Sequence, residues 1–142
     1  MIMDDKAEIL LVEDDDNDVA VALRALSRQS LDRKVRVMRD GAELLDYLFD
    51  GTRRALPKAI LLDLKMPRLD GRSALRELRR HPETRHVPVV IVSSSERESD
   101  VRECYELGAN SFIVKQPNPW DPGAYLVETV RYWLDRNEVT RV

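Results

Sequence analysis

Short strand-like runs alternate with longer amphipathic segments along the whole chain, and this alternation limits the folds open to it. The runs are four to six residues long and rich in Val, Ile and Leu, which is typical of strands. The predicted strands cover residues 9–12, 34–39, 59–62, 87–92 and 111–114. The predicted helices cover about residues 17–30, 41–49, 72–80, 98–107 and 121–136. Strict alternation of this kind predicts a parallel sheet with helices on both faces.

The first predicted helix carries its apolar side chains at helical spacing. Val19, Leu23 and Leu26 fall on one face, so we expect this face to pack on the sheet. Asp16 or Asn17 is the expected N-terminal cap, because the side chains of both residues accept hydrogen bonds from the free N–H groups of a first turn.

The strand order is limited by the handedness of the connections. Right-handed crossovers leave few arrangements, and the flavodoxin-like order 2-1-3-4-5 is one of the two common ones. We therefore expect an α/β fold, a flavodoxin-like (βα)5 three-layer sandwich. The length suits one domain over residues 1–142, with a core of about 7–136 and a short tail, 137–142. In such folds ligands bind beyond the carboxyl ends of the strands.

The composition argues against several classes of protein. A net charge of −3 is unlike a nucleic-acid-binding domain, which normally has a basic face. No apolar run approaches the roughly 20 residues that span a bilayer, and acids interrupt the N-terminal segment too early for a secretory signal. The lone Cys104 suits a reducing compartment. We expect a cytoplasmic protein that binds neither nucleic acid nor membrane.

Polar and charged side chains follow four of the predicted strands. The acids 13–16 follow the first strand, Asp63 the third, Ser93 the fourth and Lys115 the fifth. The first and third strands are neighbours in the expected order, so Asp63 lies near the acids of the first strand. Clustered carboxylates raise each other's pKa, and a bound Mg²⁺ removes this cost. Carboxylate oxygens are also the ligands that Mg²⁺ prefers.

Not every acid in these loops needs a function. Asp15, Asp16 and Asp18 are expected to be solvated loop residues. Asp63 differs from them, because it follows an apolar run directly and is itself followed by KMP and then DG, which a generic loop does not require.

Four segments at the strand ends resemble the landmark segments of response-regulator receiver domains: LLVEDD, LLDLKMPRLDG, VIVSSS and FIVK. The resemblance covers about residues 7–136. It implies that Asp63 is the phosphoacceptor, and that Ser93 and Lys115 bind the phosphoryl group.

The resemblance also implies a metal site and a switch residue. Mg²⁺ would be held by Glu13, Asp14, Asp63 and the backbone carbonyl of Lys65. Phe112 matches the aromatic position that reports the switch, with packing alone as its means because it lacks a hydroxyl group.

A sensor histidine kinase is the partner that the resemblance implies. Its phosphohistidine would pass the phosphoryl group to Asp63 in a Mg²⁺-dependent reaction in which positioning and charge neutralisation do most of the work. The added charge would then change the face formed by the fourth helix, fifth strand and fifth helix. Such a protein catalyses only its own phosphorylation and dephosphorylation, so we expect no separate enzymatic activity.

The segment after Lys115 departs from the family pattern. Many receivers have proline directly after the lysine, whereas here Gln116 separates Lys115 from Pro117. A cis bond before a residue other than proline costs about 3 kcal/mol. We therefore predict either a cis Gln116–Pro117 bond or an all-trans loop, and no cis bond between Lys115 and Gln116.

The C-terminal segment is rich in aromatic side chains: Trp120, Tyr125, Tyr132 and Trp133. Together with the KxP arrangement, they resemble the single-domain regulators that work with phytochrome kinases, which makes a bacteriophytochrome an expected kinase. Aromatics on a terminal helix are also common interface anchors, so we expect a homodimer through the last helix and strand. With only residues 137–142 after the receiver, the expected output is a partner protein, a further phosphotransfer step or a change of oligomeric state.

Three alternatives share parts of this pattern. A haloacid-dehalogenase-type phosphatase needs an aspartate two residues after its nucleophile, and Lys65 occupies that position. A pseudo-receiver interaction module usually lacks one of the functional residues, and all are present here. A flavin-binding domain needs a phosphate-binding loop after the first strand, where this chain has four acids.

Overall fold

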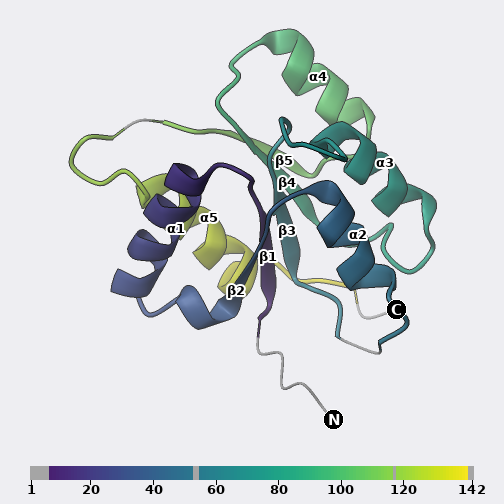
Figure 1. The fold of residues 1–142 in the computed structure, drawn as a ribbon, viewed down its shortest axis with the longest axis horizontal. Coiled ribbons are helices and arrows are strands. Elements are labelled where there is room, and N and C mark those ends of the chain that lie inside the picture. The colour runs from purple at the N-terminus through teal and green to yellow at the C-terminus, as the bar shows by residue number, and fades with distance from the viewer. Residues whose placement is uncertain (1–6, 53–54, 117, 141–142) are drawn as a thin grey trace.

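The computed structural model describes residues 7–52, 55–116 and 118–140. Five parallel strands form one sheet of order β2-β1-β3-β4-β5 (Figure 1). The strands are β1 (Ile9–Val12), β2 (Val35–Met38), β3 (Ala59–Leu62), β4 (Val89–Ser93) and β5 (Ser111–Val114). The predicted flavodoxin-like α/β fold and its strand order are confirmed.

Helices cover both faces of the sheet. They are α1 (Asp16–Arg28), α2 (Gly41–Phe49), α3 (Gly71–Arg80), α4 (Glu98–Glu106) and α5 (Ala124–Arg131), the last continuing as a π-helical turn over Tyr132–Arg136. Helices α1 and α5 pack on one face, and α2, α3 and α4 on the other (Figure 1). No helix among the described residues has both the length and the apolar character needed to cross a membrane.

The central strands are buried on both faces. In β1, Ile9 and Leu11 belong to the core under α1 and α5, whereas Leu10 and Val12 belong to the core on the opposite face. All four residues of β3 are fully buried. A strand covered on both faces needs apolar side chains at every position, and this explains why β1 and β3 are continuous apolar runs. The edge strand β5 is half-buried throughout.

The predicted buried face of α1 was partly wrong. Leu23 is 39% exposed, and the buried face consists of Val19, Ala22, Ala25 and Leu26. Small side chains on this face allow a close approach: a Cβ atom on Gly123, just before α5, would lie 2.3 Å from the Cβ of Ala25. Apolar spacing alone does not show that alanines form the contact.

The ends of several elements also differ from the prediction. The N-terminal cap of α1 is Asp15, whose side chain accepts a hydrogen bond from the backbone of Asp18, and not Asp16 or Asn17. A 3₁₀ turn over Asp32–Lys34 shortens the second strand. The fourth strand begins two residues later than predicted and includes Ser93, and the last helix begins at Ala124 rather than at residue 121.

The loop that joins β3 to α3 is bound to Asp40 and also passes close to the backbone of Asp63. The Arg68 guanidinium donates two hydrogen bonds, of 2.6 and 2.9 Å, to the buried carboxylate of Asp40. Arg68 has a φ of 63°, a left-handed conformation that is unfavourable for a residue with a Cβ atom. At the end of the loop, a Cβ on Gly71 would lie 2.2 Å from the carbonyl oxygen of Asp63. The backbone after β3 therefore turns back tightly on itself.

Gly71→Ala tests this close approach. The added methyl group meets backbone atoms, which cannot move aside as a flexible side chain can, so we expect the free energy of unfolding to fall by about 2–3 kcal/mol. Urea denaturation measures the change. The control is Gly51→Asn, at a left-handed position (φ +85°) where no atom of the described residues lies within 4 Å of a Cβ, and where we expect less than about 1 kcal/mol. Equal losses in the two variants would contradict the packing argument.

Candidate functional site

The charged residues predicted from the strand ends meet at the carboxyl edge of the sheet. Val12 pairs with Leu62 in the β1–β3 register, so Glu13 and Asp63 leave the sheet side by side. Backbone hydrogen bonds continue the ladders into the site: the Asp63 N–H donates to the Val12 carbonyl (3.1 Å), and the Lys115 N–H to the Ser93 carbonyl (2.8 Å). The sheet thus fixes the backbone from which each functional side chain leaves.

Three carboxylates gather at this edge. Glu13, Asp14 and Asp63 each offer an oxygen, and these oxygens all lie within 4.8 Å of one another. Glu13 is buried, Asp63 is half-buried and Asp14 is exposed. The Oε2 atom of Glu13 is buried without a hydrogen-bond partner among the described residues, which marks a place for a cation or a donor. A set of hard oxygen donors open to solvent on one side suits Mg²⁺ or Mn²⁺.

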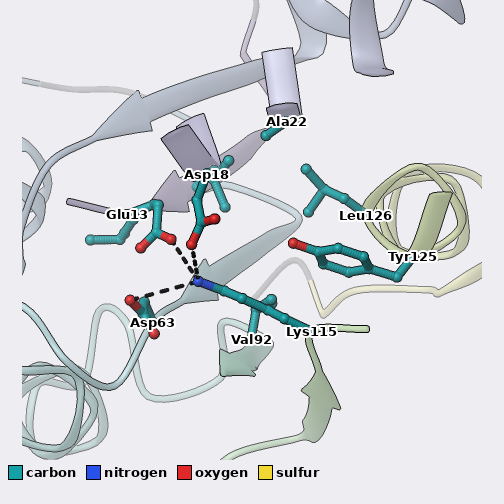
Figure 2. A pocket seen from close by; sticks show the side chains of 10 residues that line it. Glu13, Asp18, Ala22, Asp63, Val92, Lys115, Tyr125 and Leu126 are labelled. Carbon is teal, nitrogen blue, oxygen red and sulfur yellow. Dashed lines mark hydrogen bonds and ion pairs between the residues drawn. The ribbon is translucent and has the colours of Figure 1, made fainter. Parts of the chain in front are cut away.

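The Lys115 ammonium lies beside this cluster (Figure 2). Its Nζ donates to Glu13 Oε1 at 2.6 Å and to Asp18 Oδ2 at 2.8 Å, and it lies 3.9 Å from Asp63 Oδ2. Burial alone would lower the pKa of Lys115. The hydrogen bonds to Asp18 and Glu13 and the charge of Asp63 outweigh burial and raise this pKa above its ordinary value.

The charges of the two acids that contact Lys115 are set by different surroundings. Burial, more than any other cause, raises the pKa of Glu13 to about 9, with further increases from Asp63 and Asp18 and a decrease from Lys115. The pKa of Asp18 is lowered, by its hydrogen bonding with Glu13 and with Lys115. Glu13 therefore resists ionisation, whereas Asp18 ionises readily.

Asp18 was wrongly predicted to be a solvated loop residue. With Asp15 as the cap, Asp18 is the third residue of α1, a position whose side chain turns back toward the helix start and here reaches Lys115. Asp16 is as exposed as predicted and pairs with Arg39 at 2.6 Å. Correct placement of the cap at Asp15 would have revealed that Asp18 faces the site.

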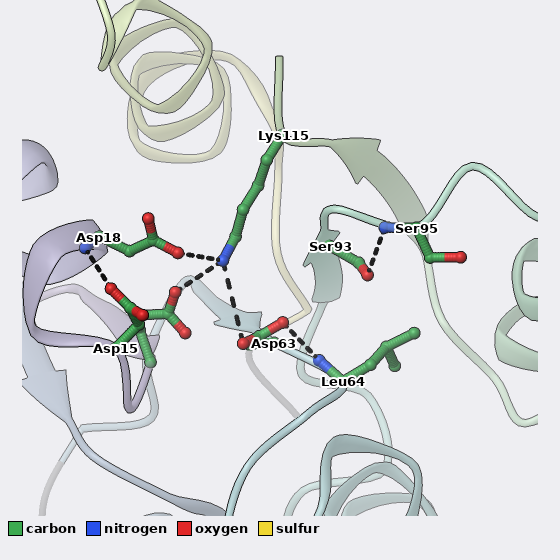
Figure 3. A network of polar contacts seen from close by, with 8 residues as sticks. Asp15, Asp18, Asp63, Leu64, Ser93, Ser95 and Lys115 are labelled. Carbon is green, nitrogen blue, oxygen red and sulfur yellow. Dashed lines mark hydrogen bonds and ion pairs between the residues drawn. The ribbon is translucent and has the colours of Figure 1, made fainter. Parts of the chain in front are cut away.

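Ser93 is buried at the end of β4. Its Oγ accepts a hydrogen bond from the Ser95 backbone N–H at 3.1 Å (Figure 3). The Ser95 hydroxyl in turn donates to Asp100 Oδ2 at 2.5 Å, and Asp100 Oδ1 accepts from Arg72 at 2.7 Å. Ser93 therefore belongs to a chain of hydrogen bonds that extends through the β4–α4 loop to α4 and α3.

The other predicted residues lie around this centre. Lys65 is exposed in the loop after β3. Phe112 is half-buried in β5 and packs on the core beneath α2, α3 and α4. The Lys115–Gln116 bond is not cis, as predicted. The Gln116–Pro117 bond lies outside the described residues, because they omit Pro117.

Tyr125 of α5 is a site residue whose position the sequence did not reveal. It lines a small pocket with Lys115, Asp18, Leu126 and other residues, and its ring lies beside the Lys115 stem (Figure 2). Burial raises the pKa of the Tyr125 hydroxyl. The Tyr125 ring thus forms part of the wall of the pocket that holds the lysine side chain.

The raised pKa of Glu13 predicts that the metal-free protein becomes less stable as the pH rises. The folded state keeps the Glu13 proton up to about pH 9, whereas the unfolded chain loses it near its ordinary pKa. We expect the free energy of unfolding in urea with a chelator to fall by about 1–2 kcal/mol between about pH 5 and pH 8, a value reduced for solvent screening. Glu13→Gln should remove most of this slope; an unchanged slope would contradict the assignment.

The sequence matches one protein family over most of its length. Residues 9–122 match the response regulator receiver domain. A probable methanogenesis regulatory protein, FilR2 of Methanothrix harundinacea, is 35% identical over 131 residues, which cover 91% of this chain and 84% of that protein. Response regulator Rcp1 of Synechocystis is 33% identical over 132 residues, covering 89% of this chain and 88% of Rcp1.

Solved structures of such proteins have the same fold. The Mn²⁺-bound form of Rcp1 has a TM-score of 0.81 at 31% identity and covers 93% of this chain and 97% of its own. The phosphorylated cyanobacterial phytochrome response regulator RcpA has a TM-score of 0.82 at 32% identity and covers 92% of this chain and 96% of its own. This chain belongs to the response regulator receiver domain family of two-component signalling proteins.

Proposed function

We propose that this chain accepts a phosphoryl group on Asp63 from a sensor histidine kinase in a Mg²⁺-dependent reaction. The observation that carries the proposal is the arrangement around Asp63. The Asp63 carboxylate lies within 4.8 Å of two further acid ligand atoms and has an ammonium 3.9 Å away. Negative charge added at Asp63 would thus meet a cation site and a lysine.

Four groups would hold the metal ion: the carboxylates of Glu13, Asp14 and Asp63 and the backbone carbonyl of Lys65. The buried Oε2 of Glu13, which has no hydrogen-bond partner in the part of the chain that the structure describes, supports this assignment. When bound, Mg²⁺ supplies the positive charge that offsets the crowded acids and the phosphoryl oxygens.

The remaining chemistry belongs to the side chains of the chain itself. An Asp63 oxygen attacks the phosphorus atom, and the new O–P bond forms as the P–N bond of the donor phosphohistidine breaks. The electron pair of the P–N bond leaves on the imidazole nitrogen. Lys115 donates a charge-assisted hydrogen bond to a phosphoryl oxygen, and the Ser93 hydroxyl donates another.

Phosphorylation would act on the α4-β5-α5 face through Ser93. The Ser93 Oγ accepts from the Ser95 N–H in this structure, so its own hydroxyl proton is available for donation to a phosphoryl oxygen. Movement of Ser93 toward the phosphoryl group frees space beside β5, which Phe112 can enter by rotating. The half-buried edge position of β5 favours such a rearrangement. The phosphoryl group then stabilises one of two packings, which is a population shift.

The proposed role is signalling without turnover of a separate substrate. We assign residues 1–142 to one receiver domain, with Lys65 in place of the general acid that a dehalogenase-type phosphatase needs. A pseudo-receiver remains the alternative that the labelling experiment below tests. A reducing cytoplasm is the proposed location, in keeping with the lone, buried Cys104.

The proposed partners are a phytochrome-type kinase and, in a homodimer, a second copy of this chain. The name of RcpA links that relative to phytochrome signalling. Here Tyr132 is 50% exposed at the end of α5 and packs edge-on against Trp133, with 5.0 Å between ring centroids. Exposed aromatic rings held rigid by a neighbour are suited to anchor a second copy of the chain.

Asp63→Asn tests the acceptor. Incubation with labelled acetyl phosphate should label the wild-type protein only when Mg²⁺ is present, and the variant should lose the label, because an amide is a far weaker nucleophile than a carboxylate. The control Asp135→Asn removes an exposed acid of the C-terminal turn and should be labelled normally. Labelling of Asp63→Asn at the wild-type level would contradict the proposal.

Fast hydrolysis must be separated from failure to react. Phosphate release that depends on Mg²⁺ and on Asp63 shows a short-lived phosphoryl group even when no label remains. Absence of both label and release would favour a pseudo-receiver.

Sedimentation tests the dimer. We expect self-association at micromolar concentration, weakened about tenfold in Tyr132→Ala by the loss of an aromatic anchor. Leu23→Ala is the control, since it removes an exposed apolar side chain from α1. A monomeric protein at this concentration, phosphorylated or not, would exclude the dimer.

A further inference from the structure

The Lys115 ammonium has three N–H donors, and two of them are already engaged. Glu13 Oε1 takes one at 2.6 Å and Asp18 Oδ2 takes another at 2.8 Å. Asp63 Oδ2 lies 3.9 Å away, too far for a hydrogen bond. Because the donors of an ammonium point in tetrahedral directions, two fixed bonds also fix the direction of the third donor.

Asp18 differs from the other acids of the site in its position. It comes from α1, and its side chain is 44% exposed, compared with 5% for Glu13 and 18% for Lys115. Its backbone N–H donates to the capping Asp15 at 2.9 Å, which holds the first turn of the helix in place. Asp18 and Asp63 thus contact or approach the ammonium from different directions (Figure 3), and Asp18 is the more exposed of the two acids.

The two carboxylates that accept hydrogen bonds from Lys115 differ in their relation to the expected metal site. Glu13 belongs to the group of three acids whose oxygens lie within 4.8 Å of one another, and Asp18 does not. Under the proposed function, metal binding engages Glu13, which then shares its charge between the metal and Lys115. The Asp18 carboxyl contacts Lys115 and Glu13 but lies outside this group of three acids.

We propose that Asp18 is a positioning residue that holds the Lys115 ammonium so that its free N–H faces the phosphoryl group on Asp63. The inference rests on the proposed function of Asp63. A lysine side chain has a long flexible stem, and holding it in one geometry costs conformational entropy. Asp18 and the Tyr125 ring remove this freedom before the phosphoryl donor arrives, which makes the lysine a preorganised donor.

Asp18→Asn is the central variant, because it keeps the size of the side chain and removes its charge. We expect the rate of Mg²⁺-dependent labelling by acetyl phosphate to fall about tenfold, the effect of one weakened charge-assisted hydrogen bond. The affinity for Mg²⁺ alone should stay within about twofold of the wild type. The matched control is Asp16→Asn, which removes an equal charge from the same helix turn but contacts Arg39 instead of Lys115, and it should be labelled at the wild-type rate.

A double-mutant cycle with Lys115→Met separates positioning from a general effect. If Asp18 acts through Lys115, then Asp18→Asn has no further effect on labelling once the ammonium is gone. An additional tenfold loss in the Lys115→Met background would overturn the inference. So would an equal loss in Asp16→Asn, which would indicate an effect of net charge, or a large loss of Mg²⁺ affinity, which would indicate a role at the metal.

A measurement without phosphorylation distinguishes failure of this inference from failure of the proposed function. In NMR spectra of ¹⁵N-lysine-labelled protein, the held Lys115 ammonium should exchange its protons slowly and give an observable signal. We expect this signal in the wild type and Asp16→Asn, and its loss in Asp18→Asn and Lys115→Met. Persistence of the signal in Asp18→Asn would overturn the positioning role whether or not Asp63 is phosphorylated.

Discussion

The balance between crowded carboxylates and one ammonium is the interaction on which the rest of the site depends. Glu13, Asp14 and Asp63 offer oxygens within 4.8 Å of one another, and Lys115 lies against two of these acids. Burial first, and the neighbouring acids Asp63 and Asp18 after it, raise the pKa of Glu13 and disfavour its ionisation. The cluster therefore has an unmet demand for positive charge, which a divalent cation would satisfy and on which the proposed role of Asp63 rests.

The sheet makes this crowding possible. Side chains that repel one another stay together only on a backbone that cannot relax, and the apolar strands β1 and β3 provide it. Backbone ladders extend to Asp63 and Lys115, and Gly71 lets the chain turn back at once after β3. The stability of the core thus offsets the electrostatic cost of the site.

Much of this arrangement could be predicted from the sequence, because central parallel strands are buried on both faces and stand out as apolar runs. The strand ends then placed Glu13, Asp63 and Lys115 at one edge. The errors concern features that depend on a helix start or on packing partners. Asp18 was misjudged because the cap of α1 is Asp15. An error of one or two residues in the cap assigns every residue of the first turn to the wrong position, and so to the wrong direction. Leu23 was misjudged because small alanines form the helix contact.

The hydrogen bonds from Ser93 through Ser95 and Asp100 to Arg72 join the proposed phosphorylation site to helices α4 and α3. A coupling of this kind is reciprocal, since two binding equilibria linked through one element change each other by the same factor. If a target protein prefers α4 in the arrangement that releases Ser93, it will favour the phosphoryl group on Asp63 as strongly as the phosphoryl group favours the target. Occupancy by the target would then help to set the fraction of the protein that is phosphorylated at equilibrium.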